Sequence, residues 1–174
     1  MNDDSVPARL LFFYSSQQFD TGSPRALASQ IELLDRKRFT PLFLATGDGP
    51  LLGALEGRGV AIVRGSVTTV NWRRPVALWR AIRRQVVLLR AHRIALVHVN
   101  EMGWNLDLVL AAWLCRIPVV LQLHLPGGVA FQNLHRFAAR KVLLVSAAQR
   151  LAIEHFDRFR APSEVLYSPV DLDT

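Results

Sequence analysis

Residues 95–124 read ALVHVNEMGWNLDLVLAAWLCRIPVVLQLH, and their pattern of apolar residues is the clearest indication of the fold class. Two short apolar runs, Ala95–Val99 and Pro118–Leu123, flank a longer apolar stretch of helical character at Leu106–Cys115. The short runs are continuous and do not alternate with polar residues, which is typical of strands that are covered on both faces of a parallel sheet. Two parallel strands joined through a helix form a right-handed crossover. The stretch therefore predicts a parallel α/β domain.

The same alternation of strand and helix extends in both directions along the chain. Further strands are predicted at Arg9–Ser15, Pro41–Thr46, Val60–Val63, Val142–Val145 and Val165–Tyr167. Further helices are predicted at Pro24–Leu34 with Ser23 as N-cap, from Pro50 to about Gly57, and at Pro75–His92, Gln132–Ala139 and Ala147–Phe156. About six alternations predict a doubly wound, Rossmann-like parallel sheet of six to seven strands, in the order 3-2-1-4-5-6 with an optional seventh at the far edge.

Composition favours one globular domain over residues 1–174. Hydrophobic residues make up 51% of the chain, which is enough for a core and excludes a disordered protein. The longest apolar run, Leu108–Cys115, is shorter than the roughly 18–20 residues of a membrane span. The N-terminus lacks the basic segment of a secretory signal, and Cys115 is the only cysteine, so no disulfide within the chain can form. We expect a cytoplasmic protein.

Positive charge is concentrated in one part of the chain. The net charge is +7, and no acid occurs between Glu56 and Glu101, an interval that holds nine arginines. In the helix Pro75–His92, one side carries Trp79, Ile82, Val86 and Leu89, and Arg80, Arg83 and Arg84 lie on or near the other. This is either the solvated face of a packed helix or a helix that binds an anionic surface such as the inner membrane face, aided by an exposed Trp72 or Trp79. Nucleic acid is not expected as a partner, because aromatic residues are not interleaved with the arginines.

Ligands of doubly wound sheets bind at the carboxyl ends of the strands, so the residues after each strand are the candidates. Gly22 lies in the loop 15–23 after the first strand, which is either an anion site or an ordinary capped loop. Asn100 and Glu101 follow the fourth strand and either bind a sugar or ribose or cap the next helix. His124 follows the fifth strand, before two glycines, and is either a hydrogen-bonding or acid–base group or a structural histidine.

Two other sequence patterns do not indicate a binding site. The run Gly47-x-Gly49-x-x-x-Gly53 resembles a dinucleotide fingerprint, but its spacing is wrong and no acid follows at the required distance, so we interpret it as a turn with helix packing. His92, His135 and His155 are too far apart to suggest a metal site.

The ordered series of segments resembles glycosyltransferase family 4 over residues 9–172. The series comprises Gly22–Leu27, Glu32–Asp35 with Arg38-Phe39, Gly47–Leu51, Leu96–Asn100, Ile117–Val120 with His124, Val145-Ser146 and Tyr167–Asp171. The resemblance implies the GT-B fold, in which two Rossmann-like domains face each other across a cleft. It also implies metal-independent transfer of a sugar from a nucleotide-sugar donor with retention of configuration, and no cofactor. This chain would be the N-terminal, acceptor-side domain.

By the same resemblance, His124 would approach the transferred sugar as the catalytic residue. Gly22, Ser23, Asn100, Glu101 and Ser146 would bind donor or acceptor, and the acceptor would be a sugar or a lipid-linked group. The sequence departs from the family at Ser168-Pro169, where Asn-Gly is common, and it contains no C-terminal donor-binding domain. We therefore expect this chain alone to be inactive. The alternative function is a non-catalytic binding module that uses its basic face to recruit an anionic partner or membrane.

Overall fold

The computed structural model describes residues 6–68, 73–101, 105–124, 138–152 and 160–167. Within them lies a sheet of seven strands in the order β3-β2-β1-β4-β5-β6-β7. Every neighbouring pair is parallel. The fold class and strand order predicted from the sequence are confirmed, including the seventh strand at the far edge. The strands are β1 Ala8–Phe13, β2 Phe39–Ala45, β3 Ala61–Arg64, β4 Ile94–Val99, β5 Val119–Leu123, β6 Ala139–Leu144 and β7 Ser163–Val165.

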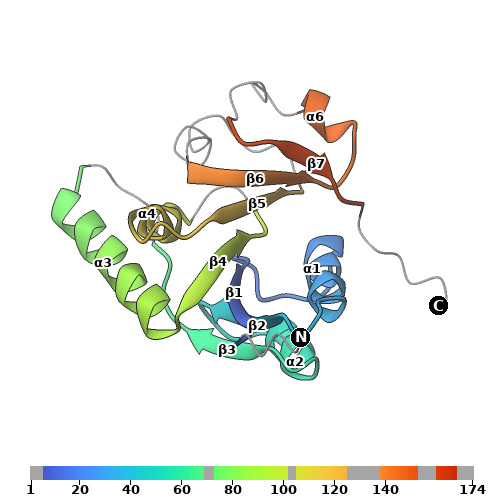
Figure 1. Cartoon of the computed structure of the whole chain (residues 1–174), viewed down its shortest axis with the longest axis horizontal. Coiled ribbons are helices and arrows are strands. Elements are labelled where there is room, and N and C mark those ends of the chain that lie inside the picture. Colours follow the sequence, from blue (N-terminus) through green and yellow to red (C-terminus); the bar gives the residue numbers. More distant parts are fainter. Residues whose placement is uncertain (1–5, 69–72, 102–104, 125–137, 153–159, 168–174) are drawn as a thin grey trace, which may run out of the picture.

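Helices cover the sheet on two faces. The helices are α1 Gly22–Glu32, α2 Pro50–Glu56, α3 Pro75–Ala91, α4 Leu106–Leu114 and the short α6 Gln149–Ala152. Figure 1 shows α1 and α2 on one face of the sheet and α3 and α4 on the other. The chain thus winds outward from β1 to β3 with α1 and α2 on one face, and then crosses back along the other face through α3 to form β4 beside β1.

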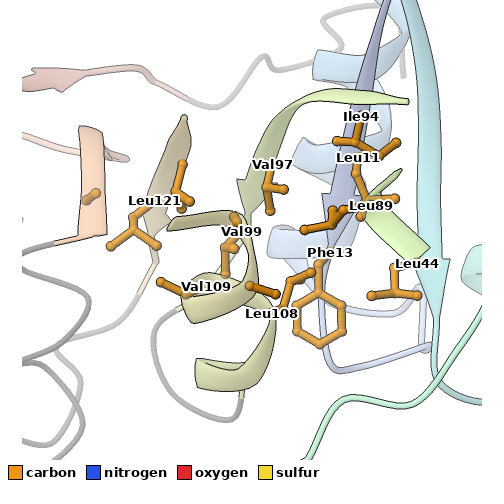
Figure 2. Packing of buried hydrophobic residues seen from close by; sticks show 14 of the residues in the cluster. Leu11, Phe13, Leu44, Leu89, Ile94, Val97, Val99, Leu108, Val109 and Leu121 are labelled. Carbon is orange, nitrogen blue, oxygen red and sulfur yellow. The ribbon is translucent and has the colours of Figure 1, made fainter. Parts of the chain in front are cut away.

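Each strand contributes to two apolar cores because successive side chains point to opposite faces. Leu11 and Phe13 belong to the core beneath α3 and α4, whereas Leu10 and Phe12 belong to the core beneath α1 and α2. Figure 2 shows Leu108 and Val109 of α4 pointing toward the strand side chains of the first core. Continuous apolar strands are therefore required, as the sequence pattern indicated.

Some boundaries differ from the prediction. β6 begins at Ala139, the last residue of the predicted helix Gln132–Ala139, because β6 pairs with β5 from Val119 onward. The rest of that helix lies largely outside the described residues, as does the end of the predicted helix Ala147–Phe156. β7 lies two residues earlier than predicted, because Ser163 is in register with Val142.

The start of α1 also differs. The helix begins at Gly22 with Thr21 as its N-cap, and no side chain caps it. Ser23 therefore lies inside the first turn and is not the N-cap that the sequence predicted. Its side chain hydrogen-bonds with Tyr14 at the end of β1 and not with the helix backbone.

Candidate functional site

The candidate site lies at the switch point of the sheet, between β1 and β4. These strands are neighbours, yet the chain after β1 enters α1 on one face and the chain after β4 enters α4 on the other. Doubly wound sheets bind ligands at such a divergence, at the carboxyl ends of the strands, and we refer to this place as the crevice. Asn100 extends the pairing of β1 with β4 by one residue, because its backbone N–H donates to the carbonyl oxygen of Phe13 at 2.9 Å.

Asn100 and His124 meet at this point. The Oδ1 atom of Asn100 lies 2.8 Å from Nε2 of His124, and Nδ2 of Asn100 lies 3.5 Å from the carbonyl oxygen of Ser23. Asn100 is fully buried and His124 is half-buried. Neither Asn100 nor Glu101 caps the next helix, because the N-cap of α4 is Asn105. The structure therefore joins three of the predicted site residues, Ser23, Asn100 and His124.

A second polar pair lies one step deeper on the same face of the sheet. His98 Nε2 is 3.0 Å from Gln122 Oε1, and the rings of His98 and Phe12 are 5.1 Å apart. His98 is in register with Val120, and its partner Gln122 lies two residues further along β5. Asn100 and His124 are offset in the same way. Burial lowers the pKa of His98 to about 4, so this ring is neutral at physiological pH. The pair forms a neutral polar support beneath the crevice.

Glu101 joins the loop after β4 to the loop after β1. Its two carboxylate oxygens accept hydrogen bonds from the Ser15 backbone N–H at 3.1 Å and from the Ser15 hydroxyl at 2.6 Å. Burial raises the pKa of Glu101, although the hydrogen bonds from Ser15 oppose the shift. Burial also raises the pKa of the nearby Tyr14 hydroxyl. These contacts hold the two loops that border the crevice in one arrangement.

The glycine run after β2 contributes to the same loop. The backbone N–H of Leu51 in α2 donates to the carbonyl oxygen of Gln17 at 3.0 Å, and a Cβ atom at Gly49 would lie 2.7 Å from Cβ of Gln17. Gly49 therefore permits the close approach of two loops, which agrees with the interpretation of the run as a turn, whereas a Cβ atom at Gly53 in α2 would meet nothing within 4 Å.

The remaining predicted ligand-binding residues lie around these contacts. Gly22 is exposed at the first position of α1, and nothing lies within 4 Å of where its Cβ atom would be. Ser146 follows β6, and its hydroxyl oxygen accepts a hydrogen bond from the backbone N–H of Gln149 at 3.3 Å. Among the described residues, no three His, Cys, Asp or Glu side chains gather into a possible metal site.

The predicted basic surface lies on α3. Arg80, Arg83 and Arg84 are exposed, and together with Ala77 and Val87 they line a shallow hollow of about 620 Å³. The lining residues in the described part of the chain all belong to α3 and not to the loops at the strand ends. No helix in the described part of the chain is both long and apolar enough to cross a membrane.

Trp79, whose exposure the sequence left open, does not belong to the packed side of α3. Its side chain is 60% exposed, and the exposed Val76 and Val87 lie on the same outer side. The buried stripe of the helix consists of Ala81, Ile82, Gln85 and Leu89. Since each residue turns a helix by about 100°, Trp79 falls on the flank of this stripe, next to the arginine face.

Sequence reasoning also missed a buried carboxylate between α3 and α4. Asp107 Oδ2 accepts hydrogen bonds from Gln85 Nε2 at 3.0 Å and from the backbone N–H of Thr68 at 3.2 Å. Gln85 Nε2 also donates to the carbonyl oxygen of Ser66 at 2.7 Å. A single acid in the otherwise apolar run of α4 was the available signal. These contacts hold the connection between β3 and α3 against α4.

The fold and the polar residues at its switch point define a doubly wound, Rossmann-like domain with its candidate site at the strand carboxyl ends. A glycosyl transferase 4-like domain model matches residues 21–170. The chain therefore belongs to the glycosyl transferase 4-like domain family, as the resemblance implied. Among curated proteins, no sequence matches it.

Longer solved structures share this fold over part of their length. HepE from Anabaena in complex with UDP is 19% identical, with a TM-score of 0.70 over 94% of this chain and 44% of that chain. A glycosyltransferase from Rickettsia africae is 16% identical, with a TM-score of 0.69 over 97% and 45%. MurG from Acinetobacter baumannii is 18% identical, with a TM-score of 0.62 over 92% and 45%. The chain thus spans less than half the length of these structures.

Proposed function

We propose that this chain is the N-terminal, acceptor-side domain of a retaining glycosyltransferase. The reaction would move a sugar from a nucleotide-sugar donor to the hydroxyl group of an acceptor, across a cleft closed by a second domain. The observation that carries the proposal is the convergence of Ser23, Asn100 and His124 at the switch point. The family match supports the reaction type. This chain matches less than half of HepE, which was solved with UDP, and this supports the need for a second domain.

Each site residue has a role in this proposal. The backbone amides around Gly22 and Ser23 lie at the positive end of α1, where they would attract the donor diphosphate. His124 would hydrogen-bond the sugar that is transferred, and Glu101 would line the acceptor side. Ser146, at the carboxyl end of β6, would contact the donor. In the proposal, amides and basic side chains neutralise the leaving diphosphate, so neither a metal ion nor a cofactor takes part.

Sugar transfer by the protein that contains this domain and its second domain tests the proposal. The purified protein would be incubated with a panel of nucleotide sugars and simple glycoside acceptors, and the anomeric configuration of the product would be determined by proton NMR. We expect transfer from at least one donor with the configuration retained. An inverted product would contradict the retaining mechanism. If none of the donors is either hydrolysed or used for transfer, the assignment as a glycosyltransferase is contradicted.

One observation favours a second candidate function, recruitment to an anionic membrane surface. Trp79 is exposed beside Arg80, Arg83 and Arg84, and an aromatic ring beside basic residues is typical of helices that lie in a membrane interface. In the described part of the chain, no acidic side chain pairs with these arginines. The same surface would serve a non-catalytic module, or it would bring the enzyme to a lipid-linked acceptor.

A further inference from the structure

The orientation of the Asn100 side chain is fixed by its surroundings. An asparagine amide has one donor end and one acceptor end, and the two are distinguished by their partners. Nδ2 faces the carbonyl oxygen of Ser23 at 3.5 Å, and a carbonyl oxygen can only accept a hydrogen bond. Turning the amide over would place two acceptor oxygens against each other. The side chain is 0% exposed, so water cannot compensate for that arrangement.

This orientation determines which nitrogen of His124 carries the proton. Oδ1 of Asn100 can only accept, and it lies 2.8 Å from Nε2 of His124, so Nε2 must be the donor. Burial lowers the pKa of His124, so the neutral ring, which has a single N–H, predominates at neutral pH. In that form Nδ1 carries a lone pair and no proton.

We propose that Asn100 is a positioning residue that holds His124 as its Nε2–H tautomer, so that Nδ1 accepts a hydrogen bond from a sugar hydroxyl group in the crevice. This inference rests on the proposed function for the identity of the ligand, but the tautomer itself does not depend on it. Asn100 then acts through His124, and its full burial is compatible with that task.

The tautomer has a consequence for the substrate class. A nitrogen lone pair binds a hydroxyl group, which can donate, but it repels a carboxylate, which can only accept. The site would therefore select a sugar with a hydroxyl group at the position that faces His124. Where that group is the C6 hydroxyl of a hexose, the site would disfavour the corresponding hexuronate. In Asn100→Asp, a carboxylate beside Nε2 would favour the doubly protonated ring, as a neighbouring opposite charge does. Nδ1 would then donate, and the preference would shift toward the hexuronate.

A merely structural role for the Asn100–His124 bond makes a different prediction. If the bond only satisfies polar groups within the fold, the tautomer is the same, but Asn100→Asp would change the pKa of His124 without changing which sugar is transferred. His98 provides an internal reference in the same spectrum, because its ring pairs with Gln122 and not with Asn100. With its pKa lowered to about 4, His98 is neutral in the wild type at pH 7.5, where the spectra are compared.

Nitrogen-15 NMR of the imidazole rings of this chain tests the inference, with the His124 signals assigned through His124→Gln. We expect the wild type to show a protonated Nε2 and an unprotonated Nδ1 at pH 7.5. In Asn100→Ala the two tautomers should mix. In Asn100→Asp the pKa of His124 should rise by about one unit or more. A wild-type ring protonated at Nδ1, or a tautomer mixture equal to that of Asn100→Ala, would overturn the inference. The wild-type spectrum decides this even if a variant does not fold.

The specificity step is tested separately with the two-domain protein. The ratio of transfer from a nucleotide hexose to transfer from the matching hexuronate should fall at least about tenfold in Asn100→Asp, which corresponds to one hydrogen bond. An unchanged ratio would contradict the specificity step. If the wild type transfers no sugar at all, the proposed function fails, whereas the NMR result still decides whether Asn100 fixes the tautomer.

Discussion

Gly49 packs directly against the backbone of Gln17, and the two loops at the carboxyl ends of β1 and β2 leave no room for a side chain between them. A Cβ atom at position 49 would come within 2.7 Å of Cβ of Gln17 and within 2.9 Å of its carbonyl carbon. Gln17 in turn accepts the hydrogen bond from Leu51 at the start of α2. This contact sets the position of the loop that leads to Gly22 and Ser23.

We expect Gly49→Ala to destabilise the chain by about 1–3 kcal/mol, because the extra methyl group overpacks a backbone contact. Gly53→Ala is the matched control. Gly53 lies inside α2, a Cβ atom there meets nothing within 4 Å, and alanine favours the helix by about 0.5–1 kcal/mol. Urea unfolding of both variants measures the effects. Equal stability of the two variants would show that the loops do not pack as described.

Asp107 provides a test of the contact between α3 and α4. Asp107→Ala leaves the backbone N–H groups of Thr68 and Leu108 without their acceptor, so we expect a loss of about 1–3 kcal/mol in the free energy of unfolding. Asp107→Asn keeps an acceptor oxygen and removes a buried charge, so its loss should be smaller. Urea unfolding at pH 7 ranks the variants, and a larger loss for Asp107→Asn would contradict this account.

The pH dependence of these variants follows from the same carboxylate. Burial raises the pKa of Asp107 above its usual value of about 3.9, so the folded state favours the protonated form. The stability of the wild type relative to Asp107→Asn should therefore rise as the pH falls through the folded pKa, and level off below the unfolded one. Unfolding free energies of both proteins measured from pH 7 to pH 3.5 give this difference. A difference that moves in the opposite direction would mean that the carboxylate is stabilised in its ionised form.

If the proposed function holds, the chain alone should bind a nucleotide sugar weakly or not at all, because the proposed second domain would supply the other wall of the cleft and its contacts to the donor. Isothermal titration of this chain with nucleotide sugars measures the affinity. Micromolar binding would mean that the loops after β1 and β4 hold the donor without a second domain.

The basic surface of α3 should bind anionic vesicles in a salt-sensitive way. Each basic residue at such a surface contributes about 1 kcal/mol, so replacing Arg80, Arg83 and Arg84 with Gln should weaken binding by about 100-fold at low salt. Replacing Arg36, Lys37 and Arg38 with Gln is the control, because it removes the same charge from an exposed loop outside α3. Vesicle sedimentation measures the binding of both triple variants. Equal binding would mean that α3 is only a helix with a solvated basic face and does not bind the vesicles.

Most of the fold could be predicted from the sequence because its signals are local. Continuous apolar runs between helical stretches identify the strands of a sheet covered on both faces, and the strand order follows from the doubly wound pattern. The errors fall where pairing with a neighbour sets the boundary, as at Ala139 in β6. The exposure of Trp79 could not be predicted, because helical spacing alone does not define the centre of the buried stripe.

The candidate site could be predicted only as separate residues. His124 and Asn100 were selected because each follows a strand, but their contact at 2.8 Å depends on the register of β4 and β5. The partners of Glu101 and Asp107 lie 86 and 39 residues away in the chain, in Ser15 and Thr68. Such pairs become visible only when the sheet has brought the strand ends together.

The role of the crevice around His124 in sugar transfer is tested most directly by the transfer rate of the two-domain protein carrying His124→Ala. His92→Ala is the matched control. His92 is the C-cap of α3 and lies just before the amino end of β4, whereas the site lies at the carboxyl ends of the strands. Circular dichroism and the urea midpoint establish that both variants are folded. We expect His124→Ala to lose about 100-fold or more in kcat, since a group positioned at the reacting sugar contributes at least that much, and His92→Ala to retain the wild-type rate. Near-normal turnover by folded His124→Ala would contradict the claim that the crevice around His124 is where the sugar is transferred.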